Sequence, residues 1–403
     1  MKILVLNCGS SSVKYKLIET KTNQTLAEGG VEKIGLADAF IKFKLAEGGK
    51  KSLPLDITDH NGAIKSILNI LTDADYGCIS HFDEIEAVGH RVVHGGEKFN
   101  RSMLINDEVI AMIKECYDIA PLHNPVNMAG IDAITAILPS VPQVAVFDTA
   151  FHQTMPPKAY MYALPYKYYK EDGVRRYGFH GTSHRYVSRR VCQFLGIDYA
   201  ATKTITCHIG NGGSITAVDC GRSIDTSMGL TPVEGLMMGT RCGDVDPGAL
   251  TFLMQKHNLS AKDLQNIINK KSGMAGFTEV SSDMREIDAA IAAGNEQARL
   301  GWEMYVNRIT KYIGAYAAEM GGLDVIVFTG GVGENQANVR AGVCAPLAFM
   351  GVKVDAELNK TRGEEAVIST ADSRVKVVVI PTDEELMIAR DTEAIVEGRE
   401  ITD

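Results

Sequence analysis

The sequence lacks paired cysteines, an excess of basic residues and a long apolar run. Its eight cysteines form no Cys-x-x-Cys pair and show no metal-ligand spacing, so we expect reduced thiols rather than a disulfide framework. The 41 Lys and Arg residues are outnumbered by 50 Asp and Glu, and the net charge of -9 argues against a nucleic-acid partner. The apolar run 2–6 ends at Asn7 and is too short for a secretion signal or a membrane span. We therefore expect a cytoplasmic protein with no membrane partner.

Two common nucleotide-binding fingerprints are also missing. The chain contains neither Gly-x-x-x-x-Gly-Lys-Ser/Thr nor Gly-x-Gly-x-x-Gly. Three Gly-rich turns nevertheless follow apolar runs, at residues 7–12, 210–214 and 330–335. Glycine allows a turn to adopt unusual dihedral angles and to bring its backbone N–H groups close to phosphate. One such turn is usually a plain hairpin, but three predict a nucleotide bound by another architecture.

The turns belong to a repeat. Apolar runs 2–6 and 13–18 flank the first turn, and runs 204–209 and 215–218 flank the second in the same way. A weaker repeat pairs the run ending at Asp148 with the run before Asp383. Because predicted helices alternate with these strands, we expect an α/β protein with two similar halves, each a mixed sheet flanked by helices. Chance similarity of strand–turn–strand units is the alternative.

Helix signals and composition outline the rest of the chain. The repeat divides it into domains at residues 1–150 and 151–384, with a C-terminal helix 385–403 that could pack on the first. The polar, lysine-rich segment 29–59 is interpreted as an excursion from the first sheet. Helix boundaries are predicted from capping residues: after Asn106, at Asn124-Pro125, at Thr182 or Ser183 with an end at Gly196, and in a capping box at 382–385.

A series of motifs then runs along the whole chain in order. They occupy residues 7–14, 89–96, 147–152, 177–184, 208–214, 228–247, 330–335 and 381–385. On these residues the sequence resembles the acetate kinase family, within the superfamily of acetate and sugar kinases, Hsp70 and actin. The departures are Cys8, where another small residue such as Ala also occurs in the family, and segment 29–59, which carries no motif.

The resemblance implies a fold and an activity. The fold would have two similar α/β domains with the active site in the cleft between them. The activity would be reversible, direct in-line transfer of the ATP γ-phosphoryl group to acetate, giving acetyl phosphate and ADP on a route to acetyl-CoA. Mg²⁺ would be required, with Mn²⁺ as a substitute, and the protein would form a homodimer through its second domain.

The chemistry brings two anions together, so it needs positioning and charge neutralisation. Arginine suits both substrates because its guanidinium is planar, always charged and bidentate. The resemblance implies that Arg91 binds the carboxylate and that Arg241 and His180 contact the phosphoryl group. A zinc site at His180 and His184 is disfavoured, because Gly181 stands where the zinc-protease motif has Glu.

Further roles come from the resemblance alone. Asp148 would belong to the catalytic centre, and Asn7 and Glu384 would bind Mg²⁺, although a helix cap is the simpler interpretation of a lone carboxylate. Lys14 would contact phosphate, although Ser11 to Lys14 also matches the Ser-x-x-Lys motif of β-lactamases. The nucleotide would further contact His208, Ile209, Gly210, Asn211, Gly212, Asp283, Met284, Arg285, Gly331, Val332, Gly333, Glu334 and Asn335. A small apolar pocket for the methyl group of the acid would be formed by Val93, Leu122, Phe179 and Pro232.

Three alternatives stay open. A propionate kinase of the same family differs only in substrate preference. An ATP-driven binding protein of the Hsp70 or actin type would leave Arg91, Arg241 and the apolar pocket without a task. A sugar kinase would need a larger pocket rich in Asp, Asn and Gln, which the motifs around Val93 and Phe179 do not offer.

Overall fold

The structure is a computed structural model that describes residues 1–45 and 48–401. The chain divides into two compact units. The first contains Met1–Gln153 and Asp383–Asp403, and the second contains Thr154–Thr382. The limits expected from the sequence, 150 and 384, lie a few residues from these. The chain therefore leaves the first unit once and returns to it at its C-terminal end.

The first unit is built on an eight-stranded sheet with the order β5-β4-β3-β2-β1-β6-β8-β7. β2 is antiparallel to β1, β6 is parallel to β1, and β8 is parallel to β6. The strands are β1 (Lys2–Gly9), β2 (Ser12–Glu19), β3 (Gln24–Glu32), β4 (Phe40–Lys44), β5 (Lys50–Pro54), β6 (Ala87–Val92), β7 (Met103–Leu104) and β8 (Gln143–Phe147). The interpretation of segment 29–59 as an excursion is thus wrong in part, because β3, β4 and β5 extend the sheet.

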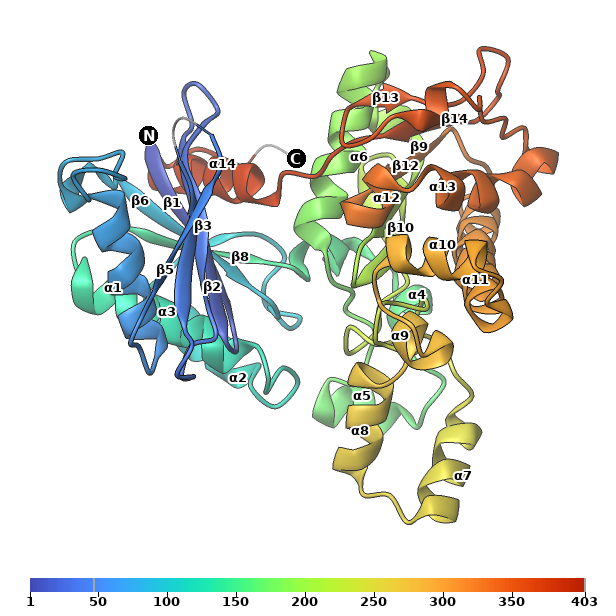
Figure 1. Cartoon of the computed structure of the whole chain (residues 1–403), viewed down its shortest axis with the longest axis horizontal. Helices are drawn as coiled ribbons and strands as arrows, with labels where there is room; N and C mark the ends of the chain where they lie inside the picture. Colours follow the sequence, from blue (N-terminus) through green and yellow to red (C-terminus); the bar gives the residue numbers. More distant parts are fainter. Residues whose placement is uncertain (46–47, 402–403) are drawn as a thin grey trace. The chain divides into compact units, whose positions relative to one another are not determined.

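Helices cover both faces of this sheet, because alternate residues of a strand point to opposite sides. Leu4 and Leu6 of β1 face the core that includes α1, while Ile3 and Val5 face α14. Figure 1 shows α14, drawn in red, beside the blue strands β1 and β6. The helices are α1 (His60–Leu71), α2 (Asp107–Glu115), α3 (Asn124–Ile137) and α14 (Glu384–Val396), with short 3₁₀ turns at η1 (Phe82–Glu84) and η2 (Ala150–Thr154).

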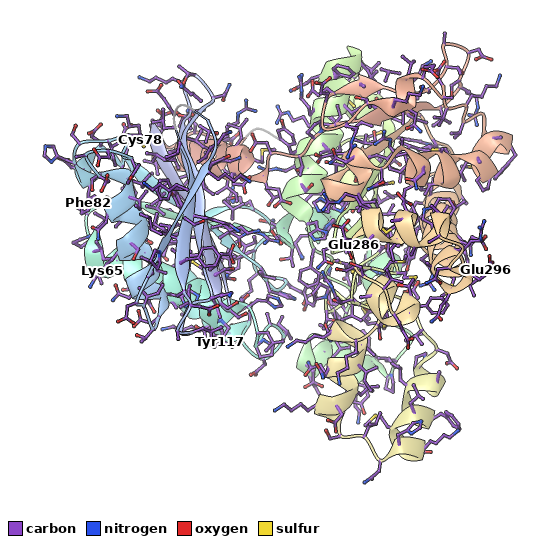
Figure 2. The ribbon with its side chains drawn as sticks, viewed as in Figure 1. Lys65, Cys78, Phe82, Tyr117, Glu286 and Glu296 are labelled. Carbon is purple, nitrogen blue, oxygen red and sulfur yellow. The ribbon has the colours of Figure 1, made fainter. Side chains whose placement is uncertain are left out.

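α1 illustrates how the sequence forms these elements. Asp59 accepts a hydrogen bond from the backbone N–H of Gly62 and caps the helix. Its apolar residues recur at helical spacing and are buried, whereas the outer face carries the exposed Lys65 (Figure 2). Each Leu or Ile buried in this way stabilises the fold by about 1.5–3 kcal/mol.

The second unit repeats the first with a six-stranded sheet of order β11-β10-β9-β12-β14-β13. β9 and β10 form an antiparallel hairpin, β12 is parallel to β9, and β14 is parallel to β12. This is the order and direction of β3-β2-β1-β6-β8-β7, so the predicted duplication is confirmed at the level of topology. The strands are β9 (Lys203–Ile209), β10 (Gly213–Asp219), β11 (Arg222–Thr226), β12 (Val325–Thr329), β13 (Ala366–Val367) and β14 (Lys376–Val379).

Helices again lie on both faces. Val187 and Val191 of α6 pack with Val325 and Val327, while α11 packs on the opposite face. The helices are α4 (Pro157–Tyr160), α5 (Tyr166–Asp172), α6 (Gly181–Leu195), α7 (Pro247–His257), α8 (Ala261–Lys270), α9 (Gly273–Thr278), α10 (Met284–Ala292), α11 (Glu296–Glu319), α12 (Gly330–Asn335) and α13 (Ala337–Cys344), with 3₁₀ turns at η3 (Tyr199–Ala201), η4 (Ala345–Met350) and η5 (Leu358–Lys360). Over residues 1–45 and 48–401, no helix combines the length and the apolar character needed to cross a membrane.

The predicted helix starts are correct in position but partly wrong in mechanism. Asn106 caps α2 as expected, by accepting from the N–H of Val109. Asn124 does not cap α3, because its amide bonds to the backbone N–H and C=O of His94 instead. α14 is capped by Asp383, which accepts from the N–H of Leu386, and no capping box forms there.

Two further segments differ from expectation. α6 starts one residue before Thr182, and His180 precedes it with a left-handed φ of 56°. The third Gly-rich segment is the short helix α12 rather than a turn, and its first residue, Gly330, has a φ of +77°. Both left-handed residues stand where a strand or loop turns sharply into a helix.

Candidate active site

The first unit places an arginine and a carboxylate at the carboxyl ends of adjacent parallel strands. Arg91 lies near the end of β6, and Asp148 directly follows β8. Arg91 Nε donates to Asp148 Oδ1 over 3.0 Å, and Nη2 donates to Oδ2 over 2.5 Å. Asn7, on the next strand β1, accepts a longer bond of 3.5 Å from Arg91 Nη1. The predicted residues Asn7, Arg91 and Asp148 are therefore brought together at one sheet edge.

Glu384 adds a second carboxylate to this group. Burial raises its pKa to about 7, and the charge of Asp148 acts in the same direction, against the attraction of Arg91 and Lys14. Burial by itself lowers the pKa of Arg91, but the charges of Asp148 and Glu384 outweigh it and raise that pKa overall. Two carboxylates thus share the charge of Arg91, and Lys14 is the other cation that acts on Glu384.

These donors suit a hard divalent cation. Asn7 offers an amide oxygen, and Asp148 and Glu384 offer carboxylates, which are the ligand types that Mg²⁺ prefers. Burial, and after it the charge of Asp148, raises the pKa of Glu384, and a cation beside these groups would favour the ionised carboxylate. Within the described ranges, no group of three or more His, Cys, Asp or Glu side chains could hold a metal by itself. Water and phosphate oxygens would therefore complete a Mg²⁺ shell.

The second unit brings two of the predicted nucleotide segments side by side. In the turn after β9, the N–H of Gly210 donates to the carbonyl of Gly212 over 2.9 Å. The first residue of α12 lies against this turn, since a Cβ added to Gly330 would be 2.8 Å from the carbonyl oxygen of Ile209. A Cβ at Gly210 would in turn lie 3.9 Å from the backbone nitrogen of Gly331.

The third nucleotide segment adjoins the same turn. The N–H of Gly239 donates to the carbonyl of Asn211 over 2.9 Å, and a Cβ on Gly239 would lie 3.1 Å from Ser282 Cβ. Ser282 precedes Asp283, which caps α10 by accepting from the N–H of Arg285. The Met284 side chain belongs to the hydrophobic core, so only its backbone could face a ligand.

Arg241 lies against the backbone of the turn. A Cβ on Gly212 would overlap the Arg241 guanidinium and would lie 3.6 Å from His180 Cε1, so glycine is what lets these groups approach. Arg241 Nη1 donates to the carbonyl of Pro232 over 2.7 Å. In the described part of the chain no carboxylate pairs with Arg241, and burial lowers its pKa. Among the described residues, this guanidinium is a cation without a carboxylate counter-ion.

His180 is oriented by the hydroxyl of Ser214, a residue to which the sequence assigns no role. Its Nδ1 shares a hydrogen bond of 2.8 Å with Ser214 Oγ, which also bonds to His184 Nε2 over 2.7 Å. His184 Nδ1 bonds to Thr206 Oγ1, so both of its ring nitrogens serve the hydrogen-bond network of the sheet. The His180 ring stacks on His208 with ring centroids 4.3 Å apart. Ser214 ends the predicted motif 208–214, the only signal that pointed to it.

The four predicted pocket residues are divided between the units. Val93 and Leu122 belong to the first; Val93 donates its N–H to Asn127 Oδ1 over 3.0 Å, and Leu122 is 65% exposed. Phe179 and Pro232 belong to the second, where Phe179 is only 4% exposed. That these side chains line one pocket stays a prediction.

The chain is similar to known proteins along nearly its whole length. The pattern that defines the Acetokinase family matches residues 2–390. The acetate kinase of Phocaeicola vulgatus is 64% identical over 395 residues, 98% of this chain and 99% of that protein. The acetate kinase of Bacteroides fragilis is 63% identical over 397 residues, 98% of this chain and 100% of that protein.

Solved structures show the same likeness. The acetate kinase of Porphyromonas gingivalis matches with a TM-score of 0.96 at 58% identity, covering 98% of this chain and 99% of that one. A propionate kinase of Francisella tularensis matches with a TM-score of 0.91 at 43% identity, covering 97% and 99%. With the family pattern spanning nearly all residues and relatives this similar along their full length, the chain belongs to the acetokinase family.

Proposed function

We propose that the chain is a phosphotransferase that moves the γ-phosphoryl group of ATP reversibly to acetate, giving acetyl phosphate and ADP. The observation that carries this proposal is the Arg241 guanidinium, which lies against Gly212 without a carboxylate partner among the described residues. A cation of this kind is suited to an anion that arrives and leaves. The relatives from Phocaeicola vulgatus and Bacteroides fragilis are acetate kinases, and on this basis we assign acetate as the phosphoryl acceptor.

Arg91 is assigned to bind the carboxylate of the acceptor. Nε and Nη2 of its guanidinium donate to Asp148, whereas Nη1 has, within the described part of the chain, only the 3.5 Å bond to Asn7. Asp148 therefore holds the guanidinium in one orientation and leaves one N–H edge for the substrate. A short carboxylic acid has a pKa of roughly 4 to 5, so it is already ionised at neutral pH and needs no general base.

Arg241 and His180 are assigned to contact the transferring phosphoryl group. Both adjoin the turn after β9, where backbone N–H groups can bind phosphate oxygens. His180, held by Ser214, donates a hydrogen bond to the transferring group, and Arg241 neutralises the charge that spreads over it. Asn7 and Glu384 would hold Mg²⁺, with Asp148 close by, and the ion would supply neutralisation of phosphate charge when bound. Mn²⁺ would substitute for it.

ATP is proposed to bind through the segments that adjoin one another in the second unit, residues 208–212, 283–285 and 331–335, with Lys14 of the first unit on phosphate. Val93, Leu122, Phe179 and Pro232 would select acetate by enclosing its methyl group. Propionate remains the competing substrate, since the Francisella tularensis relative is a propionate kinase. We further propose a cytoplasmic homodimer.

Hydroxylamine trapping tests the proposal directly. The protein with ATP, Mg²⁺ and acetate should give acetyl hydroxamate, and the same assay with propionate should give less. Absence of any hydroxamate together with acetate-independent ATP hydrolysis would support the ATP-driven binding protein instead. A larger product yield from propionate would reassign the acceptor.

A further inference from the structure

Thr382 is held from two sides at the point where the chain crosses between the units. It is the last residue of the second unit, and Asp383 is the first of the returning segment. Its backbone N–H donates to Glu334 Oε1 over 3.2 Å. Its hydroxyl shares a hydrogen bond of 2.9 Å with Ser183 Oγ. A crossover residue with both groups engaged by the same unit has little freedom to move relative to that unit.

The Glu334 contact reaches one of the nucleotide segments. Glu334 lies in α12, and the oxygen that receives the Thr382 N–H also accepts from the N–H of Gly330 over 2.9 Å. A single carboxylate oxygen therefore joins the first residue of α12 to the crossover. Any shift of α12 on nucleotide binding would change both bonds together.

The hydrogen bond between Ser183 and Thr382 connects the crossover to a second nucleotide segment, residues 208–212. Ser183 is fully buried in the first turn of α6. Its hydroxyl also bonds to His208 Nδ1 over 2.8 Å, and His208 begins the proposed phosphate segment and stacks on His180. His208, Ser183 and Thr382 form a continuous series of hydrogen bonds from the phosphate turn to the crossover.

The proposed metal ligand follows immediately. Glu384 is the first residue of α14, and two peptide units separate its Cα from that of Thr382, at most about 7 Å. Asp383 between them is itself engaged, since it caps α14 and accepts from Lys16 Nζ over 3.3 Å. Thr382 therefore stays within that distance of Glu384 whatever the dihedral angles of the connection.

We propose that Thr382, through Ser183 and Glu334, is a positioning residue that couples the two nucleotide segments to the metal ligand Glu384. This rests on the proposed function. The other crossover offers a contrast: Thr154 Oγ1 donates over 2.7 Å to the carbonyl of Ser223, a residue of β11 rather than of a nucleotide segment. The hydroxyl of Thr382 thus transmits the position of bound nucleotide to the metal site.

The test compares Thr382→Val with Thr382→Ser. Valine keeps the shape and removes the hydroxyl, whereas serine keeps the bond to Ser183. We expect the valine variant to lower kcat about three- to tenfold and to raise the Mg²⁺ concentration for half-maximal activity by a similar factor. Binding of ADP without Mg²⁺ should change less than about twofold, and serine should restore both parameters.

The matched control is Thr310→Val, which removes another half-buried threonine hydroxyl, bonded to the carbonyls of Val306 and Val343 in α11 and α13. It should leave kcat and Mg²⁺ dependence unchanged. Ser183→Ala combined with Thr382→Val should cost less than the product of the single effects, because both remove the same bond.

Normal kcat and Mg²⁺ dependence in Thr382→Val would overturn the inference, as would fully multiplicative effects in the double variant. The same parallel losses in Thr310→Val would also overturn it, by showing only a general effect of hydroxyl removal. The hydroxamate assay on the unaltered protein distinguishes a failure of the proposed function from a failure of the proposed role of Thr382. Failure there removes the proposed function, whereas an active protein with a normal valine variant removes only the role of Thr382.

Discussion

The two halves of the molecule share one strand order but carry opposite electrostatic arrangements. The first half gathers Asp148 and Glu384 around a single arginine, Arg91, at the ends of its parallel strands. The second half places Arg241 against the turn after β9, where the described residues offer it no carboxylate. Common backbone topology therefore does not determine the chemistry. The residue types at the strand ends do, and they make one half suited to a cation and the other to an anion.

The largest expected effect separates the two arginines. Arg91→Ala and Arg241→Ala should each lower kcat/KM on the order of 10³-fold. Their stabilities should differ, because Arg91→Ala leaves Asp148, 1% exposed, without its counter-ion. Breaking a buried pair costs about 3–5 kcal/mol, whereas Arg241, which pairs with no carboxylate among the described residues, should cost less to remove. Hydroxamate kinetics and urea unfolding measure both.

Arg299→Ala, which removes an exposed arginine paired with Glu296, is the matched control and should change neither quantity. Equal loss of stability in Arg91→Ala and Arg241→Ala would erase the contrast between the two halves.

A smaller effect should follow from adding one methyl group to the phosphate turn. Gly212→Ala would push the Arg241 guanidinium aside, and a misplacement of about 1 Å can cost about 10²-fold in rate. The free energy of unfolding should change by less than about 1 kcal/mol, since the clash is with the end of a flexible side chain. Gly9→Ala, in the corresponding turn of the first half, would place its Cβ 3.3 Å from Ser12 Oγ and should have a weaker effect on kcat. A larger loss of kcat in Gly9→Ala than in Gly212→Ala would show that the turn of the first half, and not the turn after β9, is the more important for catalysis.

Substrate choice gives a test of intermediate size. Val93→Ala should favour propionate over acetate by about tenfold in kcat/KM, because a methylene in an apolar pocket is worth roughly 1–3 kcal/mol. Val92→Ala is the control: Val92 is fully buried in the core beside Phe147, so it should lose stability and keep the substrate ratio. An unchanged ratio in Val93→Ala would show that this residue does not contact the acid.

The smallest effect concerns pH. Folding raises the pKa of Glu384 from 4.5 to about 7, so the folded protein binds a proton more tightly than the unfolded chain. The free energy of unfolding without Mg²⁺ should therefore fall as pH rises from about 4.5 to 7, and Mg²⁺ should restore stability at the upper end. Thermal unfolding of Glu384→Gln should show a smaller decline, and the remainder should come from Asp225, whose pKa burial also raises to about 7. Glu303→Gln, at an exposed position of α11, should keep the full decline. A decline in Glu384→Gln as large as that of the unaltered protein would show that Glu384 does not contribute to it.

The sequence predicts what depends on local pattern. Apolar runs around Gly9 and Gly210 identify corresponding hairpins, because strand alternation and glycine turns are local properties. The strand β4 could have been predicted from the same kind of pattern, since Ile41 and Phe43 alternate with lysines. The many charged residues of this segment instead favoured its interpretation as an excursion. The family resemblance assigns Arg91 and Asp148 to the active site, but their ion pair is seen only in the structure.

Features that depend on distant contacts were not predictable. Nothing local marks the hydroxyls of Ser183 and Ser214 as partners of histidines, because they meet only after helix α6 packs on the sheet. The helical form of α12 contradicts the low helix propensity of its glycines and is determined by packing against Ile209. The side chain of Met284 turns into the core for the same reason.

The place of α14 has a consequence for how the chain is made. Ile388 and Ala389 of this helix cover Ile3 and Val5 of β1, and the ammonium group of Met1 bonds to Thr20 Oγ1 over 2.8 Å, near Glu393. A ribosome produces β1 first and α14 only after the entire second unit. The face of the first sheet that carries Ile3 and Val5 is therefore not covered by α14 during most of synthesis. The first unit begins to be translated first, yet its last helix is made only after the second unit.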